Sequence, residues 1–295
     1  MSYFCNTFGP RLTGSPELAK AQKWAVSEFS KMGCTNVHME QWGEFPVGWD
    51  RGPTQVAQMV EPYDVPMVFT TSAWTNGTNG VITAEAMYAP RTMDELNAKK
   101  AQLTGKWIIM PMGNAPRRLA PGETPPPATE ADNVRDALNT LPVAGLITGS
   151  RNELVLTGGR YTGKTYESHP GQPTIMVRKS DYDRITRNLD WNRKVVLKIG
   201  AENRWYKGPV PNYNVIAEIK GTEKPDEVVI VSGHYDSWNG PGSLGASDNG
   251  TGSAAVLEAA RILCKAGAKP KRTIRFILWS GEEQGLFGSV DYVKK

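Results

Sequence analysis

The sequence lacks the long apolar runs, the charge blocks and the cysteine density that mark three large classes of protein. In 295 residues, no apolar run approaches the roughly 18 residues that a membrane-spanning helix needs. Its 34 lysines and arginines against 30 acidic residues leave a net charge of +4 without a basic block, which indicates neither nucleic-acid binding nor polybasic membrane targeting. Three cysteines, Cys5, Cys34 and Cys264, are too few for a disulfide framework or a cysteine-rich zinc site, although one pair could still form a bridge.

The composition is that of a globular protein. With 39% hydrophobic, 22% charged and 9% aromatic residues, the chain is neither collagen-like nor of low complexity nor generally disordered. At about 150 residues per domain, its length predicts roughly two domains. The first ten residues lack a charged segment followed by an apolar one, so the sequence as given shows no export signal.

The N-terminal part predicts one helix and one strand. Ser15 can cap a helix that has proline at its first position, and apolar residues then recur at helical spacing until Gly33 ends it. A strand follows over 37–41, after which prolines and glycines at 46–53 interrupt the periodicity. We therefore predict a first segment over 1–55 that ends at a domain boundary.

Residues 56–205 alternate short predicted strands with turns, which is typical of a small, mostly β domain. Two short helices are expected inside it, near 131–138 and 180–188. The proline-rich stretch 120–128 cannot pair in a central strand and predicts an exposed, extended loop. The expected strands are 67–69, 80–86, 106–110, 145–147, 153–156, 174–177 and 195–199.

The C-terminal part, 206–295, has the pattern of an α/β sheet domain, in which strands and a helix alternate. We therefore predict an α/β fold whose sheet is flanked by helices. The expected strands are 214–218, 228–232 and 273–279, and the expected helices are 253–265 and one that begins at Leu286.

Acidic and imidazole side chains follow the predicted strands of this part. His234 and Asp236 come directly after the apolar strand VVIVSG, and Glu282 and Glu283 come after TIRFILWS. Asp248 lies in the glycine-rich turn GASDNGTG, just before the predicted helix. Because open α/β sheets bind their ligands at the carboxyl ends of the strands, we expect these side chains to meet at one edge.

This set of residue types fits a metal centre. In an extended chain, side chains two residues apart point the same way, so the Asp236 carboxylate can hold the His234 imidazole as a metal-bound histidine requires. The Asp248 carboxylate, held by rigid backbone, could bridge two cations. Of the two adjacent glutamates, one can bind metal while the other reaches a water molecule as general base.

Each residue also has a simpler interpretation. A histidine beside an aspartate at a strand end is most often a hydrogen-bonded surface pair, and an aspartate in a glycine-asparagine turn usually only shapes that turn. A pair of glutamates is usually a solvated helix N-terminus. The succession of all three at the ends of consecutive strands in one α/β unit favours the metal centre.

Three motifs resemble the zinc aminopeptidases of metallopeptidase family 28, in particular carboxypeptidase Q-like and aminopeptidase members with a protease-associated domain insert. The motifs are VSGHYDSW, GASDNGTGSAAVLEAARIL and FILWSGEEQGLFGS, in the order of the family. FGPRLTGSPELAKAQKWAVSEF resembles the family's N-terminal segment, and LTGKWIIM and QPTIMVRKSDYDRI resemble protease-associated domain strands. The resemblance covers nearly the whole chain. It assigns 1–55 and 206–295 to the peptidase domain and 56–205 to the insert.

Carried over by position, the resemblance implies two zinc ions in a complete active site, bound by five protein ligands of which this sequence supplies three. It also implies a cis peptide bond between the bridging aspartate and Asn249. The metal ligands would be His234 on one zinc, Asp248 bridging both and Glu283 on the other, with Glu282 as general base and Asp236 orienting His234.

The resemblance further implies an exopeptidase of the aminopeptidase or dipeptidase type, which hydrolyses peptide bonds near a free terminus. Its substrate would be a peptide, its location would be secreted or periplasmic, and a homodimer is compatible with the family. Neither nucleic acid nor a membrane span is expected. Because an aspartate and a histidine of the family pattern are absent from this sequence, we expect an incomplete fragment with little or no activity.

Two other functions compete with this one. Residues 158–165, GGRYTGKT, match the phosphate-binding pattern G-x-x-x-x-G-K-[ST]. That loop must lead into a helix, whereas Pro170, Gly171 and Pro173 follow here, so a chance match is favoured. The chain could instead be a non-catalytic interaction module on the peptidase scaffold, which the retained histidine and acidic residues disfavour. Zinc content would separate these alternatives.

Overall fold

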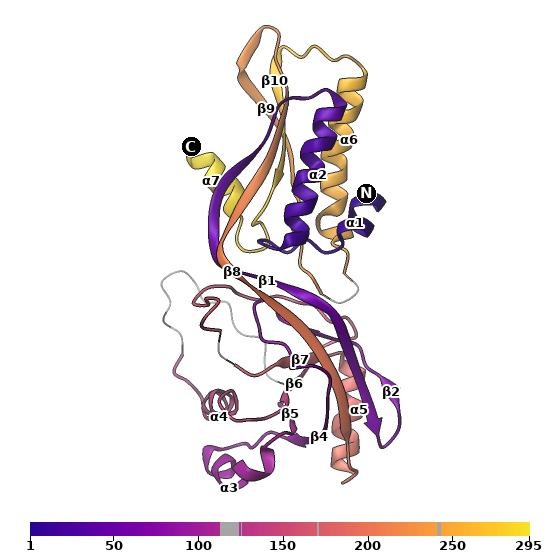
Figure 1. The fold of residues 1–295 in the computed structure, drawn as a ribbon, viewed down its shortest axis with the longest axis vertical. Coiled ribbons are helices and arrows are strands. Elements are labelled where there is room, and N and C mark those ends of the chain that lie inside the picture. Colours follow the sequence, from indigo (N-terminus) through magenta and orange to yellow (C-terminus); the bar gives the residue numbers. More distant parts are fainter. Residues whose placement is uncertain (113–123, 125, 170, 241–242) are drawn as a thin grey trace. The chain divides into compact units, whose positions relative to one another are not determined.

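The computed structural model describes residues 1–112, 124, 126–169, 171–240 and 243–295 (Figure 1). These residues form two compact units. The first comprises Met1–Asp50, Arg160–Glu167 and Trp205–Lys295, and the second comprises Arg51–Gly159 and Ser168–Arg204. No described helix is both long enough and apolar enough to cross a membrane.

The first unit is a mixed α/β structure in which helices cover both faces of a sheet (Figure 1). Its helices are α1 (Ser2–Phe8), α2 (Pro16–Met32), η1 (Ala246–Gly250), α6 (Thr251–Lys265) and α7 (Phe287–Lys294). Its strands are β9 (Lys224–His234), β10 (Arg272–Trp279) and parts of β1 (Thr35–Glu61) and β8 (Val196–Ile219), both of which continue into the second unit.

The order of strands in this sheet is β1-β8-β10-β9. β10 runs antiparallel to β8 and parallel to β9. Helices α2 and α6 lie side by side against one face, and α7 lies against the other (Figure 1). The predicted α/β fold with helices flanking the sheet is confirmed, and so are its three expected strands and the helix over 253–265.

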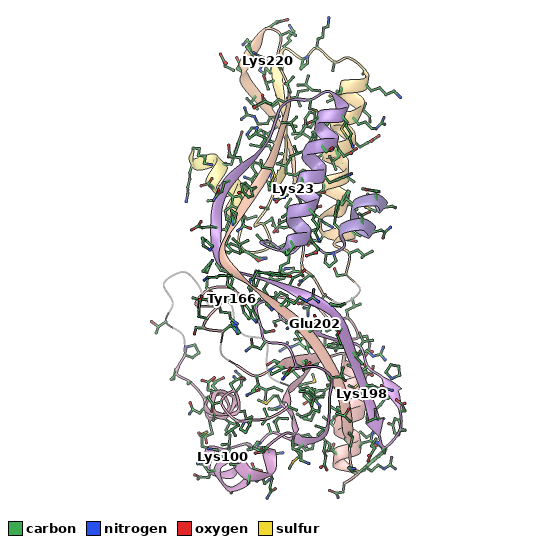
Figure 2. The ribbon with its side chains drawn as sticks, viewed as in Figure 1. Lys23, Lys100, Tyr166, Lys198, Glu202 and Lys220 are labelled. Carbon is green, nitrogen blue, oxygen red and sulfur yellow. The ribbon has the colours of Figure 1, made fainter. Side chains whose placement is uncertain are left out.

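Helix α2 follows the expected pattern from cap to glycine. The Ser15 side chain accepts a hydrogen bond from the Leu18 N–H at 3.2 Å, and the helix ends at Gly33, whose φ of 92° is left-handed. One face of the helix is buried against the sheet, while Lys23 is exposed (Figure 2). The buried apolar residues are Leu18, Ala21, Ala25 and Phe29, and the ring of the last stacks on Phe276 of β10.

The first strand differs from the prediction. Instead of a break after residue 41, β1 runs without interruption from Thr35 to Glu61. Its glycines make room for neighbouring residues: a Cβ on Gly48 would lie 3.1 Å from Val210 Cγ2, and one on Gly52 would lie 2.1 Å from Glu202 Cδ. The glycines therefore mark close approach of the partner strand, which the sequence pattern does not distinguish from a turn.

The second unit contains a parallel sheet with helices of its own. Strands β4 to β7 are parallel neighbours in sequence order, β3 runs antiparallel to β7, and β4 runs antiparallel to β8. The strands are β2 (Val65–Pro66), β3 (Phe69–Thr71), β4 (Ile82–Tyr88), β5 (Trp107–Ile109), β6 (Gly145–Gly149) and β7 (Thr174–Val177). The helices are α3 (Met93–Leu103), α4 (Glu130–Leu138) and α5 (Lys179–Asp190).

The helices expected near 131–138 and 180–188 are present, and the second unit contains a third helix, α3, that the sequence did not predict. Helix α3 escaped prediction because it buries only Leu96 and Leu103, which leaves little amphipathic pattern to detect. The strand expected over 153–156 does not form, and Leu154 is 71% exposed there. The loop expected over 120–128 lies largely outside the described residues, and the assignment as a protease-associated domain stays a prediction.

Replacing the cap of α2 should weaken the first unit. Ser15→Ala removes the acceptor of the Leu18 N–H, and we expect the free energy of unfolding to fall by about 1 kcal/mol. Urea unfolding followed by circular dichroism measures the change. Ser30→Ala, which removes an exposed hydroxyl from the end of the same helix, is the control and should change stability by less than about 0.5 kcal/mol. Equal losses in the two variants would contradict a specific capping role.

Candidate metal centre

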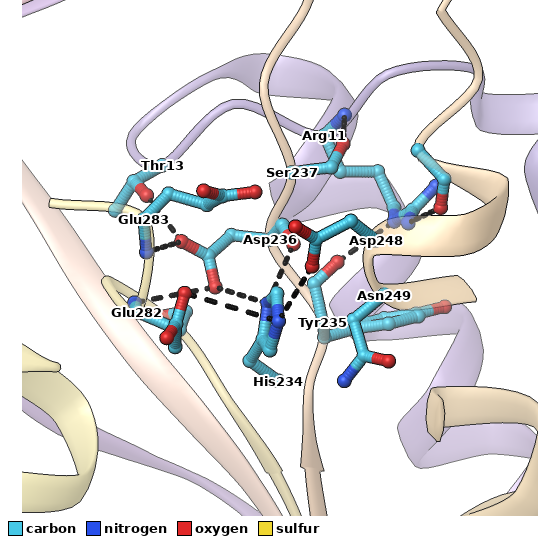
Figure 3. A network of polar contacts seen from close by, with 12 residues as sticks. Arg11, Thr13, His234, Tyr235, Asp236, Ser237, Asp248, Asn249, Glu282 and Glu283 are labelled. Atoms are coloured by element: carbon cyan, nitrogen blue, oxygen red, sulfur yellow. Dashed lines mark hydrogen bonds and ion pairs between the residues drawn. The ribbon is translucent and has the colours of Figure 1, made fainter. Parts of the chain in front are cut away.

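Three of the predicted site residues meet at the ends of the parallel strands β9 and β10. His234 is the last residue of β9, and it pairs in register with Trp279 at the end of β10. Asp248 lies in η1, just before α6, and Glu283 lies in the turn that follows β10. The ligand atoms of His234, Asp248 and Glu283 all lie within 4.8 Å of one another (Figure 3).

The imidazole of His234 faces the acidic side chains. Its Nε2 atom lies 3.0 Å from Asp248 Oδ1 and 3.8 Å from Glu282 Oε2. The His234 side chain is only 14% exposed, whereas the side chains of Asp248 and Glu282 are 75% and 36% exposed. The histidine end of the centre is therefore buried, and its carboxylate end can be reached from solvent.

Main-chain groups fix the orientation of His234. Its Nδ1 atom lies 3.1 Å from the carbonyl oxygen of Asp236, which can only accept, so Nδ1 donates and Nε2 is the nitrogen that can bind a cation. The Ser253 hydroxyl, in the first turn of α6, donates to the His234 carbonyl at 2.6 Å. The Asp236 carboxylate, which the sequence predicted would hold the ring, also lies beside it, with Oδ1 3.7 Å from Nδ1.

The Asp236 carboxylate also holds the turn that carries both glutamates. It is fully buried and accepts a hydrogen bond from the Thr13 hydroxyl at 2.7 Å. It also accepts from the main-chain N–H groups of Glu282 and Glu283, at 3.4 Å and 3.3 Å (Figure 3). Asp236 therefore connects the N-terminal segment, the end of β9 and the turn after β10.

The loop that carries Asp248 depends on the absence of side chains at two glycines. Gly245 has a left-handed φ of 56°, and a Cβ there would lie 2.3 Å from Ser237 Oγ. A Cβ on Gly252 would lie 2.4 Å from Asn249 Oδ1, which accepts a hydrogen bond from the Gly252 N–H. The expected cis peptide bond between Asp248 and Asn249 is present.

Burial and charge shift two pKa values in the centre. Burial disfavours a charged His234, but hydrogen bonding to Asp236 and the negative charges of Asp236 and Glu282 outweigh it and raise the pKa of His234 to about 9. Burial, with the negative charges of Asp236 and Asp248, raises the pKa of Glu283 to about 7. At neutral pH the cluster therefore holds protons where a cation would bind.

This arrangement fits a divalent cation. An imidazole nitrogen and the oxygens of two carboxylates are among the ligands that Zn²⁺ takes, and these ligand atoms all lie within 4.8 Å of one another. The raised pKa of His234 also shows that the surrounding carboxylates stabilise positive charge at that position. The residues present therefore match the chemistry of the predicted metal.

The remaining histidines and the phosphate-loop pattern lie elsewhere. The Nδ1 atom of His38 lies 2.9 Å from the Asn36 carbonyl oxygen, and that of His169 lies 2.8 Å from Asn76 Oδ1. Neither belongs to the candidate metal-binding cluster. No helix follows the GGRYTGKT segment within the described residues 158–169, so the structural context of a phosphate-binding loop is missing.

Two residues near the centre had no predicted role. Thr13 and Arg11 lie in the N-terminal segment GPRLTGS, and Figure 3 shows both beside the residues of the centre. Their contacts reach residues more than 200 positions away, such as Asp236 from Thr13. The periodicity of apolar residues along the sequence does not predict contacts between residues so far apart. The motif was the only available signal.

Comparison with known proteins identifies relatives of the chain. Residues 214–295 match the model of Peptidase family M28. Carboxypeptidase Q of Mus musculus is 32% identical over 289 residues, which cover 97% of this chain and 58% of that protein. A probable zinc metalloprotease of Pyrenophora teres f. teres is 41% identical over 107 residues, which cover 34% of this chain and 22% of that protein.

A solved structure agrees in fold. The crystal structure of the Peptidase M28 precursor from Shewanella amazonensis SB2B is similar over 99% of this chain and 65% of that one, with 28% identity and a TM-score of 0.63. The chain therefore spans less than two thirds of the length of these relatives.

Zinc binding should release the protons that His234 and Glu283 hold. With pKa values of about 9 and 7, both groups are protonated at pH 6, so we expect about two protons to be released there and about one at pH 8. The apparent affinity for zinc therefore rises with pH, most steeply below pH 7. Calorimetric titration in two buffers of different ionisation enthalpy counts the released protons.

The matched variant for this measurement is Glu283→Gln, which cannot release a carboxyl proton. At pH 6 it should release one proton fewer than the unaltered chain, with a smaller difference at pH 8. Zinc binding without proton release at pH 6 would contradict the raised pKa values.

Proposed function

Since the chain belongs to peptidase family M28, we propose that it carries part of the centre of a di-zinc exopeptidase of the aminopeptidase or dipeptidase type. The convergence of His234, Asp248 and Glu283 on one small volume is the observation that carries this proposal. The names of the relatives, a carboxypeptidase and a probable zinc metalloprotease, support hydrolysis of peptide bonds with zinc. Because the chain spans 58% of the length of mouse carboxypeptidase Q, the activity concerns the whole protein.

The ligand roles follow from the family pattern and the positions of the atoms. His234 Nε2 would hold one zinc and Glu283 the other, and Asp248, 75% exposed and 3.0 Å from His234, would bridge them. Bound zinc supplies Lewis acidity, which lowers the pKa of a water molecule and polarises a carbonyl group. The protein supplies a rigid frame, since both strand ends are anchored by main-chain hydrogen bonds.

Glu282 is the proposed general base. Its carboxylate lies 3.8 Å from His234 Nε2, and its main-chain N–H is held by the buried Asp236. In peptide hydrolysis, Glu282 takes a proton from the attacking water as the C–O bond forms. It then delivers that proton to the amide nitrogen as the C–N bond breaks, and the amine leaves neutral.

The finer assignments remain proposals that rest on the resemblance alone. We propose that the substrate is a peptide, cleaved next to a free N-terminus or taken as a dipeptide. Placement outside the cytoplasm and pairing with a second copy are also predictions.

Zinc binding by single variants tests the assignment of roles. We expect His234→Ala and Glu283→Gln each to weaken zinc binding at least about tenfold, because each removes a direct ligand. Glu282→Gln should bind zinc with nearly unchanged affinity, because a general base is not a ligand. In the whole protein, assayed for dipeptide hydrolysis, Glu282→Gln should lower kcat by about 10² to 10⁴.

The control is Glu258→Gln, which alters an exposed ion pair with Arg261 on α6 and should leave zinc binding unchanged. If Glu282→Gln lost as much zinc affinity as Glu283→Gln, the roles of ligand and base would have to be exchanged. A chain that binds no zinc would overturn the proposed function and leave the interaction module as the better explanation.

A further inference from the structure

Arg11 is a buried arginine in the N-terminal segment that connects both ligand-bearing loops. Resting on the proposed function, we propose that Arg11 is a positioning residue that fixes the Asp248 loop against the end of β9 and so sets the spacing of the metal ligands. Its exposed fraction is 0%, and among the described residues no carboxylate lies in salt-bridge distance of its guanidinium. Nearly all of its hydrogen-bonding capacity goes to main-chain carbonyl groups.

The guanidinium reaches three segments at once. Its Nε atom donates to the carbonyl of Tyr235 at 2.8 Å, between His234 and Asp236. Its Nη1 donates to Gly9 at 2.9 Å and to Leu244 at 3.1 Å. Its Nη2 donates to Gly245 at 2.9 Å, three residues before Asp248. One planar group therefore joins the strand of the histidine ligand to the loop of the aspartate ligand.

The surroundings of Arg11 leave it little freedom. Its guanidinium carbon lies 5.4 Å from the ring centroid of Phe4 and 5.5 Å from that of Tyr235. Its main chain is paired with Ser237: the Arg11 N–H donates to Ser237 Oγ at 3.0 Å, and the Ser237 N–H donates to the Arg11 carbonyl at 3.0 Å. These contacts therefore fix the orientation of the Arg11 guanidinium independently of metal binding.

Lysine cannot replace this arrangement, although it keeps the positive charge. A guanidinium presents five donors in a plane, whereas an ammonium presents three donors from one point. Arg11→Lys would leave buried carbonyls of Tyr235 or Gly245 without a donor, and the two loops could then separate. The comparison of arginine with lysine therefore separates geometry from charge.

The test measures the zinc affinity of the 295-residue chain and of its variants. The absorption spectrum of bound Co²⁺ reports the geometry of the ligands. We expect Arg11→Lys to remain folded and to bind zinc about 10- to 100-fold more weakly, as losses of outer hydrogen-bond partners do. Its Co²⁺ spectrum should differ from that of the unaltered chain, which loss of stability alone would not cause. Millimolar guanidinium should restore part of the zinc affinity of Arg11→Ala. Arg275→Lys, which alters an ion pair with Glu218 in the same sheet, is the control and should change neither reading.

The outcomes distinguish the two proposals. Zinc binding by the unaltered chain together with equal affinity and an equal Co²⁺ spectrum in folded Arg11→Lys would overturn the role of Arg11 alone. No zinc binding by the unaltered chain would overturn both proposals. If Arg11→Lys does not fold, Ser237→Ala is measured in its place. This change removes the side-chain oxygen that accepts from the Arg11 N–H, and it should weaken zinc binding about threefold. Unchanged zinc affinity in Ser237→Ala would then count against the proposal.

Two cysteines lie close together at the C-terminal ends of α2 and α6, and they support a second, independent inference. The Sγ atoms of Cys34, directly after Gly33, and Cys264, in the last turn of α6, lie 3.5 Å apart. The two helices lie side by side, and both cysteines are half-buried (Figure 1). We infer that Cys34 and Cys264 are a disulfide-forming pair whose oxidant is a small or protein disulfide. The remaining cysteine, Cys5, is 3% exposed in the core and is not part of the pair.

The oxidation balances as two thiol–disulfide exchanges. The Cys264 sulfur attacks the oxidant, which forms a mixed disulfide and releases one thiol; the Cys34 sulfur then displaces the second thiol as the protein S–S bond forms. Two protein thiols are oxidised, one disulfide is reduced, and the two protons end on the released thiols. Burial and the neighbouring Cys264 raise the pKa of Cys34 to about 12, so the uncatalysed reaction is slow at neutral pH.

Incubation with oxidised glutathione at alkaline pH tests the pair. We expect the thiols titrated after unfolding to fall from three to one, and proteolytic mapping to find Cys34 joined to Cys264. The thermal midpoint should rise by several degrees, since the bond closes a very long loop. Cys5→Ser should still form the bond, whereas Cys34→Ser should not. Three remaining thiols, a stable glutathione adduct or a bond to Cys5 would overturn the inference.

Discussion

The candidate centre depends on one buried carboxylate, that of Asp236. A fully buried negative charge is costly unless hydrogen-bond donors surround it, and here the donors are the Thr13 hydroxyl and the N–H groups of Glu282 and Glu283. The carbonyl of the same residue accepts from His234. The hydrogen bonds that satisfy Asp236 therefore also fix the positions of the proposed ligands His234 and Glu283 and of the proposed base Glu282.

The sheet explains why such a residue is in reach of all these groups. Because β9 and β10 are parallel neighbours, their carboxyl ends meet, and His234 pairs in register with Trp279. Helix α6 begins at the same edge, where Ser253 donates to the His234 carbonyl and the preceding loop presents Asp248. The protein thus brings acidic groups around one imidazole on rigid main chain. That is the condition under which a cation can replace the protons that the cluster otherwise holds.

The sequence was sufficient for what depends on local pattern. Apolar strands followed by polar residues located His234 and Glu283, and the cap and glycine located α2. It was insufficient for contacts between distant segments. The Asp236 carboxylate accepts a hydrogen bond from Thr13, which is 223 positions away in the sequence, and the imidazole of His234 donates to the main-chain carbonyl of Asp236. Likewise, the sequence predicted that the strand would break near Gly48. The glycine is instead required by the close approach of Val210, which lies on another strand.

Anomalous diffraction at the zinc edge, from crystals of the chain grown with zinc, tests the central claim most directly. We predict a peak about 2.0–2.2 Å from His234 Nε2 and from a carboxylate oxygen of Asp248. The Asp236 carbonyl should remain bonded to Nδ1 in that structure. Zinc bound only elsewhere, for example at His38 or His169, or a centre in which His234 turns away from Asp248 would contradict this assignment.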